Sequence, residues 1–173
     1  MRKGYIQVYC GNGKGKTTAA LGLALRAAGA NLRVFILQFI KKRTCSEHKI
    51  LLERLADRIT IKQYGRGLIL KRKPTKSDVA VAQQSLVDIR TIMESDQYDV
   101  LILDEANVAV RYNLISSTDL LRIMQLKPER MELVITGRYA ERAVIAGADL
   151  VTEMKEIKHY GTKGVRARRG IEW

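Results

Sequence analysis

Short apolar runs alternate with longer amphipathic segments along most of the chain, and this alternation is typical of βαβ units around a parallel sheet. The apolar runs predict strands at residues 5–10, 32–39, 59–64, 98–103, 132–136 and 149–155. The amphipathic segments predict helices at residues 17–28, 47–57, 77–93, 118–125 and 142–146. Gly29 is expected to end the first helix and Ser77 to cap the third. The pattern therefore predicts an α/β fold with a mostly parallel sheet and helices on both faces.

Length and composition favour one soluble domain. The chain has 173 residues, 46% of them hydrophobic, which is enough for a buried core. We expect one domain, residues 1–173. No apolar run reaches the ~18 residues of a membrane span. The basic start at residues 1–10 runs into a glycine-rich loop, unlike a signal peptide. Two cysteines cannot form a disulfide framework, so the reduced cytoplasm is the expected location.

The net charge points to an anionic partner. Lys and Arg number 31 against 18 Asp and Glu, which gives +13 at pH 7 and an isoelectric point near 10.0. Such a surplus predicts binding of nucleic acid, a phosphorylated ligand or anionic lipid, and does not choose among them. The basic residues gather in a loop at residues 65–77 and in the tail at residues 158–173.

The strongest motif joins the first predicted strand to the first predicted helix and consists of Gly11, Asn12, Gly13, Lys14, Gly15, Lys16, Thr17 and Thr18. Glycines let several backbone N–H groups converge on one phosphate, and the helix adds the positive end of its dipole. Lys16 supplies a point charge, and the hydroxyl of Thr17 can ligate Mg²⁺. The strict phosphate-loop pattern has glycine where this chain has Cys10, so we expect a variant loop.

A phosphate loop needs an acidic partner at the end of a buried strand. The run 101–103 ends in Asp104 and Glu105, which fits. Asp104 would hold Mg²⁺ directly or through water, with Glu105 beside it. The motifs together predict a P-loop NTPase-like, RecA-like domain.

The reaction stays open at this point, because P-loop proteins hydrolyse ATP, phosphorylate small molecules or act as switches. In an ATPase or a small-molecule kinase, Glu105 would activate water or a substrate hydroxyl. A nucleotide-dependent nucleic-acid binder is a third reading, and its binding should weaken steeply with salt. The scattered aromatic residues offer no stacking platform, which disfavours nucleic acid as a partner.

Further sequence motifs narrow the choice among these reactions. The chain resembles the P-loop type of ATP:corrinoid adenosyltransferase in YCGNGKGKTTAALGLALRAAG, VFILQFIKK, ILDEANVAVRYNLI, VITGR, ADLVTEMKEIKH and GVRARRGIEW. The resemblance implies that Co(I) of a corrinoid attacks the 5′ carbon of ATP and that triphosphate leaves, in cobalamin biosynthesis or salvage. It implies ATP as co-substrate, Mg²⁺ or Mn²⁺ as cofactor, and Lys16 and Glu105 as catalytic residues. Arg138, in the VITGR run, becomes a further phosphate contact. Thr17, Asp104 and Glu105 become the metal ligands.

The resemblance also implies a corrinoid site on the loops after the strands, where open α/β sheets bind ligands. Its expected members are Gln38, Lys41, Leu68, Leu70 and His159. Leu68 and Leu70 stand where related sequences carry aromatic residues, so corrinoid preference is open among an early corrinoid such as cob(I)yrinic acid a,c-diamide, cobinamide and cobalamin. The family implies a homodimer, and a flavoprotein that supplies the electron is a further candidate partner.

Three remaining residues are expected to have no role in the chemistry. Cys10 and Cys45 lie far apart in sequence and without a ligand pattern around them, which argues against a zinc site. His48 is expected on the surface of a helix.

Overall fold

The computed structural model describes residues 3–67 and 72–173 and contains six strands, all parallel, in one sheet. Along the sheet their order is β3-β2-β4-β5-β1-β6. The strands are β1 (Ile6–Cys10), β2 (Val34–Gln38), β3 (Ile59–Gln63), β4 (Val100–Asp104), β5 (Glu132–Thr136) and β6 (Leu150–Glu153). The predicted α/β fold with a parallel sheet is confirmed, and each strand lies within one of the six predicted runs except β4, which extends one residue further, to Asp104.

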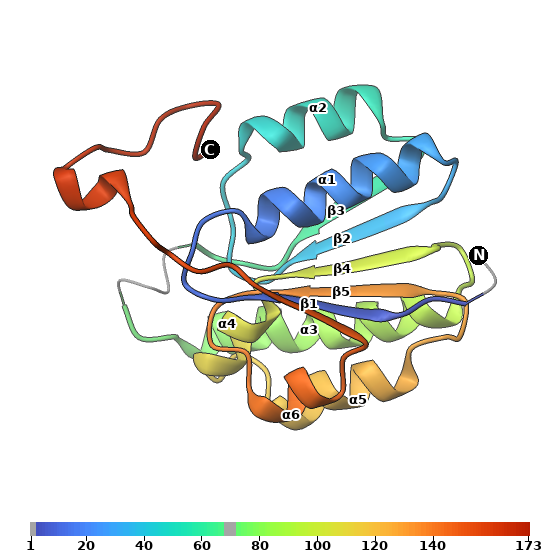
Figure 1. Ribbon diagram of the computed structural model, residues 1–173. Coiled ribbons are helices and arrows are strands. Elements are labelled where there is room, and N and C mark those ends of the chain that lie inside the picture. The colour runs from blue at the N-terminus through green and yellow to red at the C-terminus, as the bar shows by residue number, and fades with distance from the viewer. Residues whose placement is uncertain (1–2, 68–71) are drawn as a thin grey trace.

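Helices cover both faces of the sheet, as predicted (Figure 1). The first two lie on one face and the other four on the opposite face. Their bounds are α1 (Lys16–Gly29), α2 (Ser46–Arg54), α3 (Lys76–Glu94), α4 (Ala106–Arg111), α5 (Ser117–Leu126) and α6 (Arg142–Ala146). In the described part of the chain, no helix is both long and apolar enough to cross a bilayer.

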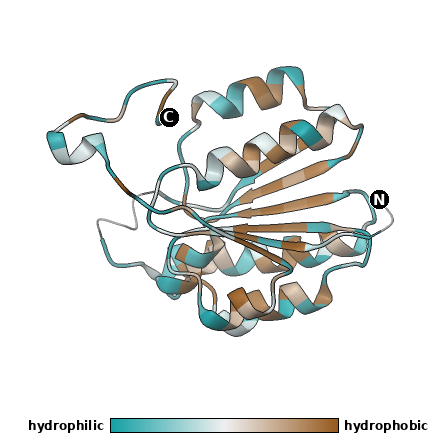
Figure 2. Cartoon of the chain, in the orientation of Figure 1, coloured by the Kyte–Doolittle hydropathy of each residue, from teal (hydrophilic) through white to brown (hydrophobic). Residues whose placement is uncertain are grey.

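The two-sided burial explains why the central strands carry unbroken apolar runs. In β4, Val100 and Ile102 pack with the alanines of α1 on one face. Their neighbours Leu101 and Leu103 pack on the opposite face with residues of α3 and α5. Successive side chains of a strand point to opposite faces, so a sheet covered on both sides needs a continuous apolar run. Figure 2 shows this as hydrophobic colour along the central strands.

The parallel arrangement places the carboxyl ends of all the strands at one edge of the sheet, where ligands bind in open α/β folds. Helix α1 begins at this edge, after the loop of residues 11–15 that follows β1. The C-terminal segment, red in Figure 1, returns to the same edge and lies near the beginning of α2. The loops after β1, β2, β4 and β5 and the tail therefore meet at one place.

The sequence analysis missed one helix and misplaced one helix cap. Helix α4 was not predicted, because its six residues closely follow β4 and are too few to show a helical period. The cap of α3 is Thr75 and not Ser77. Thr75 and Asp78 form a reciprocal capping box, in which the hydroxyl accepts from the N–H of Asp78 and the carboxylate accepts from the N–H of Thr75. Arg72 donates two hydrogen bonds to the same carboxylate.

Replacing Asp78 with alanine should lower the free energy of unfolding by about 1–3 kcal/mol, since it removes a cap and a charge-assisted pair. Hydrogen bonds from Arg72 hold the pKa of Asp78 well below its usual range. The stabilisation is therefore present above about pH 4, the usual Asp pKa, and is lost as the pH falls toward the lower folded-state pKa. Urea unfolding at pH 7 and pH 3 should show a smaller difference between wild type and variant at pH 3. An equal difference at both values would contradict the charge assignment.

Candidate active site

The predicted phosphate loop lies between β1 and α1 and is tightly packed against the end of β6. The N–H of Gly13 donates to the carbonyl of Met154 at 2.6 Å. A Cβ atom would lie 2.4 Å from that carbonyl oxygen at Gly11 and 2.7 Å from it at Gly13. Gly11 and Gly15 also have φ of 91° and 117°, which favours glycine. These glycines are therefore required by the fold of the loop, and Cys10 ends β1 as a buried side chain.

Lys16 opens α1 inside this loop and is almost completely buried. Its Nζ donates to the carbonyl oxygen of Gly13 at 2.6 Å. Burial lowers the pKa of Lys16, while the nearby carboxylate of Glu105 acts in the opposite direction. A phosphate bound beside this buried ammonium group would offset its desolvation.

Asp104 ends β4 and gathers three hydrogen bonds from three elements. Its Oδ1 accepts from the hydroxyls of Thr17 and Thr136, each at 2.8 Å. Its Oδ2 accepts from the side-chain amide of Gln38 at 2.9 Å, and the Nζ of Lys41 lies 3.6 Å from that oxygen. Asp104 has an exposed fraction of 1%, so this carboxylate is fixed in place. The predicted pairing of the phosphate loop with the acid after β4 is present.

Glu105 follows in a left-handed conformation with φ of 61°, which is rare for a residue with a side chain. Its N–H donates to the hydroxyl of Thr136 at 2.9 Å, and this bond holds the turn. Burial, together with the neighbouring carboxylate of Asp104, raises the pKa of Glu105. Strained backbone of this kind persists where the surrounding structure enforces it, typically at ligand sites.

A cavity of about 750 Å³ opens above these groups. The expected site residues on its wall are Asn12, Gly13, Lys14, Gly15, Lys16, Thr17, Thr18, Lys41, Glu105, Arg138 and His159. Gly11 supports the loop from the side of β6. Gln38 is fully buried, and its amide is bound to Asp104 and not directed to the cavity. Leu68 and Leu70 lie outside the described residues.

The tail contributes a wall that sequence reasoning missed. Gly170, Ile171, Glu172 and Trp173 line the cavity. Lys14 pairs with the carboxylate of Glu172 at 2.9 Å. The backbone carbonyl of Trp173 accepts from the hydroxyl of Ser46 at 3.1 Å, at the start of α2. Lys14, one of the side chains expected to bind phosphate, is thus paired with the carboxylate of Glu172.

Replacing Glu172 with glutamine should lower the dissociation constant for ATP about two- to fivefold. The change frees Lys14 and removes a negative charge from the cavity, and exposed ion pairs have energies of that size. Hydrogen bonds from Tyr160 and Lys14 hold the pKa of Glu172 well below its usual range, so the carboxylate is charged at neutral pH. Calorimetric titration with ATP checks this, with Glu94→Gln on α3 as the control. Weaker binding in Glu172→Gln would show that the pair supports the cavity wall.

Two expectations about the segment after β2 were wrong. His48 is not a surface residue but is buried, with an exposed fraction of 3%. Cys45 is not isolated from other ligand types, since its thiol lies within 4.8 Å of ligand atoms of Glu47 and His48. Cys10 is not part of that group. His48 lies in the first turn of α2 and contacts Gln38 at the end of β2. Helical periodicity alone did not show whether this position is buried or exposed.

The fold is that of an α/β protein of the P-loop NTPase-like class. Residues 2–173 match the model of the family described as ATP:corrinoid adenosyltransferase BtuR/CobO/CobP, and the chain belongs to this family. This confirms the resemblance seen in the sequence.

Relatives of similar length carry the same name. A corrinoid adenosyltransferase of Sinorhizobium is 33% identical over 173 residues, covering 99% of this chain and 81% of the relative. The corrinoid adenosyltransferase of Escherichia coli K12 is 31% identical, covering 99% and 86%. That of Pseudomonas aeruginosa is 29% identical, covering 99% and 84%. Family membership therefore applies to the whole described chain, including the tail that lines the cavity.

Proposed function

We propose that this protein transfers the 5′-deoxyadenosyl group of ATP to the Co(I) centre of a corrinoid. The electron pair of Co(I) forms the Co–C bond, the C5′–O bond breaks, and its electron pair leaves with triphosphate. The cobalt becomes formally Co(III). The observation that carries the proposal is one cavity lined by the phosphate loop, the carboxylate of Glu105 and apolar side chains, in a chain of this family.

The leaving group sets the main electrostatic demand. Triphosphate carries about four negative charges, so preorganised positive groups stabilise the transition state. The loop amides, the start of α1, and the side chains of Lys16 and Arg138 supply them. Since the cobalt of the substrate is the nucleophile, the reaction needs no protein base. Glu105 then serves the metal or the ribose.

A divalent cation fits the oxygen groups of this site. The hydroxyl of Thr17 and the carboxylates of Asp104 and Glu105 are hard ligands, of the kind that Mg²⁺ and Mn²⁺ prefer. Asp104 and Thr17 already lie in direct contact, 2.8 Å apart. The cation would neutralise charge on the leaving triphosphate when bound. The side chains of the protein would hold these oxygen atoms in place. The ammonium group of Lys41 lies 3.6 Å from Oδ2 of Asp104 and adds a positive charge beside them.

The apolar wall suits the corrinoid and the adenosine. Leu25, Ile50 and Trp173 line the cavity and are 57%, 53% and 43% exposed. Apolar surface of this extent around a pocket is typical of a ligand site. Contact with it would exclude water from Co(I) and from the 5′ carbon. Lys41 and His159 on the same cavity remain proposed corrinoid contacts.

Finer features belong to the same proposal. Cob(I)yrinic acid a,c-diamide is the proposed preferred corrinoid, with cobinamide and cobalamin as the competing substrates. A homodimer in the cytoplasm, with a flavoprotein as electron donor, is the proposed working form. Membership of the family is the support for these features.

Product analysis tests the proposal. The protein is incubated with ATP, Mg²⁺ and chemically reduced corrinoid, in the dark and without oxygen. Triphosphate and a light-sensitive adenosyl-corrinoid in equal amounts are the expected products. ADP and phosphate without adenosyl-corrinoid would overturn the proposal in favour of an ATPase, with Glu105 as the next residue to replace. Parallel reactions with the three corrinoids rank the substrates.

A further inference from the structure

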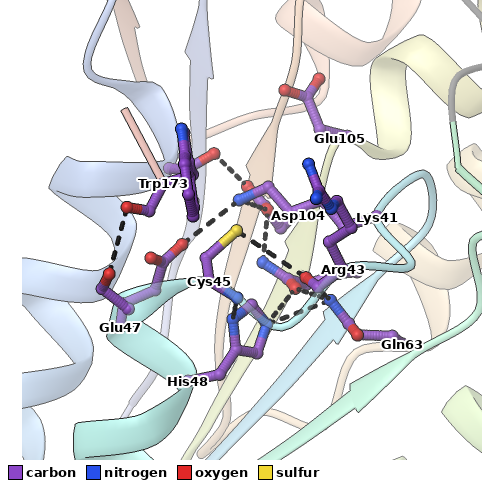
Figure 3. A network of polar contacts seen from close by, with 12 residues as sticks. Lys41, Arg43, Cys45, Glu47, His48, Gln63, Asp104, Glu105 and Trp173 are labelled. Carbon is purple, nitrogen blue, oxygen red and sulfur yellow. Dashed lines mark hydrogen bonds and ion pairs between the residues drawn. The ribbon is translucent and has the colours of Figure 1, made fainter. Parts of the chain in front are cut away.

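A chain of hydrogen bonds links the start of α2 to the acid at the end of β4 (Figure 3). The backbone N–H of Cys45 donates to Nδ1 of His48 at 2.9 Å. Nε2 of His48 lies 2.8 Å from Oε1 of Gln38. The Nε2 amide of Gln38 donates to Oδ2 of Asp104 at 2.9 Å. The side chains of His48, Gln38 and Asp104 have exposed fractions of 3%, 0% and 1%, so water does not compete for these bonds.

The partners fix the tautomer of His48. Because Nδ1 accepts a backbone N–H, it carries a lone pair and no proton. Nε2 then carries the proton and donates a hydrogen bond to Oε1 of Gln38. Burial lowers the pKa of His48, which agrees with a neutral ring. The backbone at Cys45 therefore determines which ring nitrogen faces Gln38.

The proton on Nε2 in turn fixes the amide of Gln38. A glutamine amide can be rotated by 180°, which exchanges its oxygen and nitrogen. In the rotated state its oxygen would face the carboxylate of Asp104, and its NH₂ group would face the N–H of His48. Both contacts are repulsive. The amide nitrogen of Gln63 lies 3.1 Å from the same Oε1 of Gln38 and 3.1 Å from Nε2 of His48. Because Nε2 of His48 carries a proton, this amide donates to Oε1, which favours the observed orientation of Gln38 further.

We propose that His48 is a positioning residue for Asp104 and acts through Gln38. With Gln38 donating to Oδ2, and Thr17 and Thr136 donating to Oδ1, the carboxylate is held from both sides and cannot rotate freely. Groups one step removed from a metal ligand commonly change metal affinity or activity 10–100-fold when replaced. This inference rests on the proposed role of Asp104 as a metal ligand, within the proposed function.

A metal site at Cys45, Glu47 and His48 is the competing interpretation of the same residues. Their ligand atoms lie within 4.8 Å of one another. Both ring nitrogens of His48 are already engaged, however, one by the N–H of Cys45 and one by Gln38. The Nζ of Lys41 also lies 3.7 Å from the carboxylate of Glu47. A positioning role of His48 requires these contacts as they stand in the structure. Binding of a metal by Cys45, Glu47 and His48 would have to break them.

Two substitutions of His48 separate positioning from helix capping. In His48→Asn the side-chain oxygen takes about the place of Nδ1, so the cap to Cys45 is kept and the donor to Gln38 is lost. In His48→Gln the amide nitrogen takes about the place of Nε2, so the donor is kept and the cap is lost. The positioning role predicts that Asn is the more damaging change for the site. A purely structural role predicts that Gln is.

The first readout is the affinity for ATP, measured by calorimetry with Mg²⁺ and with EDTA. In His48→Asn the dissociation constant with Mg²⁺ should rise about 10-fold. With EDTA it should change less than about twofold. In His48→Gln both values should stay within about threefold of the wild type. Thermal unfolding of each variant shows whether folding is intact, and we expect His48→Gln to have the lower midpoint.

A double variant tests the route. Gln38→Met removes the amide at similar volume, so adding His48→Asn should weaken Mg²⁺-dependent binding by less than about twofold more. Residues that act through one another are non-additive in this way. If the two effects simply multiply, His48 acts without Gln38, and the proposal is wrong.

The tautomer can be observed directly. The chain has only His48 and His159, so its ¹⁵N histidine spectrum is simple, and His159→Gln assigns it. The proposal requires the neutral Nε2–H form of His48, with a slowly exchanging proton. An Nδ1–H form, loss of the signal pattern on addition of Zn²⁺ alone, or equal ATP affinity with Mg²⁺ and with EDTA in the wild type would each overturn it. None of these readouts involves a corrinoid, so absence of adenosyl transfer in the wild type would refute the proposed function alone.

Discussion

Replacing Lys16 with alanine should lower the turnover rate of adenosyl transfer about 10²- to 10³-fold. Removal of one preorganised group that stabilises a developing anion commonly has an effect of this size. The Nζ of Lys16 donates to the carbonyl of Gly13 inside the phosphate loop, so it can move to the phosphates without a change in the backbone. Its loss should affect the transition state more than ATP binding, because charge builds up on the leaving triphosphate.

The same variant should fold as well as the wild type. Burial already lowers the pKa of Lys16, which means that the ammonium is destabilised in the free protein. Removing it should leave the free energy of unfolding unchanged or slightly higher. Anaerobic assays of triphosphate and adenosyl-corrinoid, together with urea unfolding, give both quantities on one sample.

Lys14→Ala is the matched control, because this lysine belongs to the same loop but is 42% exposed in its side chain and paired with Glu172. Its replacement should slow turnover by about tenfold at most, since a solvated cation contributes less than a buried one. A loss in Lys14→Ala as large as that in Lys16→Ala would contradict the assignment of the main phosphate contact to Lys16.

Much of the candidate site was predictable because its sequence signals are local. The glycines and lysines of residues 11–18 stand together in the sequence between a strand and a helix, and Asp104 follows directly after an apolar run. In a parallel sheet both segments end at the same edge, so their proximity follows from topology. Thr17 and Asp104 are 87 residues apart in the chain and nevertheless form a direct hydrogen bond.

The tail and His48 were not predictable in the same way. The pair of Lys14 and Glu172 joins residues 158 positions apart, and neither the charge pattern nor a predicted strand indicated the return of the chain. His48 occupies one position in the first turn of a short helix, where a surface and a buried side chain give the same local pattern. Only the packing of α2 beside β3 and the end of β2 distinguishes them.

Replacing Asp104 with asparagine should abolish the stimulation of ATP binding by Mg²⁺. The carboxylate has the charge that a hard divalent cation requires, and the amide lacks it. We expect the dissociation constant for ATP with Mg²⁺ to rise about 100-fold or more. With EDTA it should stay the same or fall, because a negative charge near the triphosphate has been removed. Calorimetry under the two conditions gives both values.

The hydrogen bonds around this position predict a second effect. The carbonyl of asparagine can accept from the hydroxyls of Thr17 and Thr136, but its NH₂ group then faces the NH₂ group of Gln38. One buried donor loses its acceptor, which should lower the free energy of unfolding by about 1–3 kcal/mol.

The control is Asp99→Asn, at the other end of β4. Asp99 accepts from the N–H of Arg33 at 2.8 Å, far from the phosphate loop, so its replacement should leave the effect of Mg²⁺ on ATP binding unchanged. If Asp104→Asn kept the wild-type response to Mg²⁺, Asp104 would only support Thr17, and Glu105 would become the main carboxylate for the cation. Comparison of Asp104→Asn with Asp99→Asn therefore separates a carboxylate that binds the metal from one that only supports the structure at the start of β4.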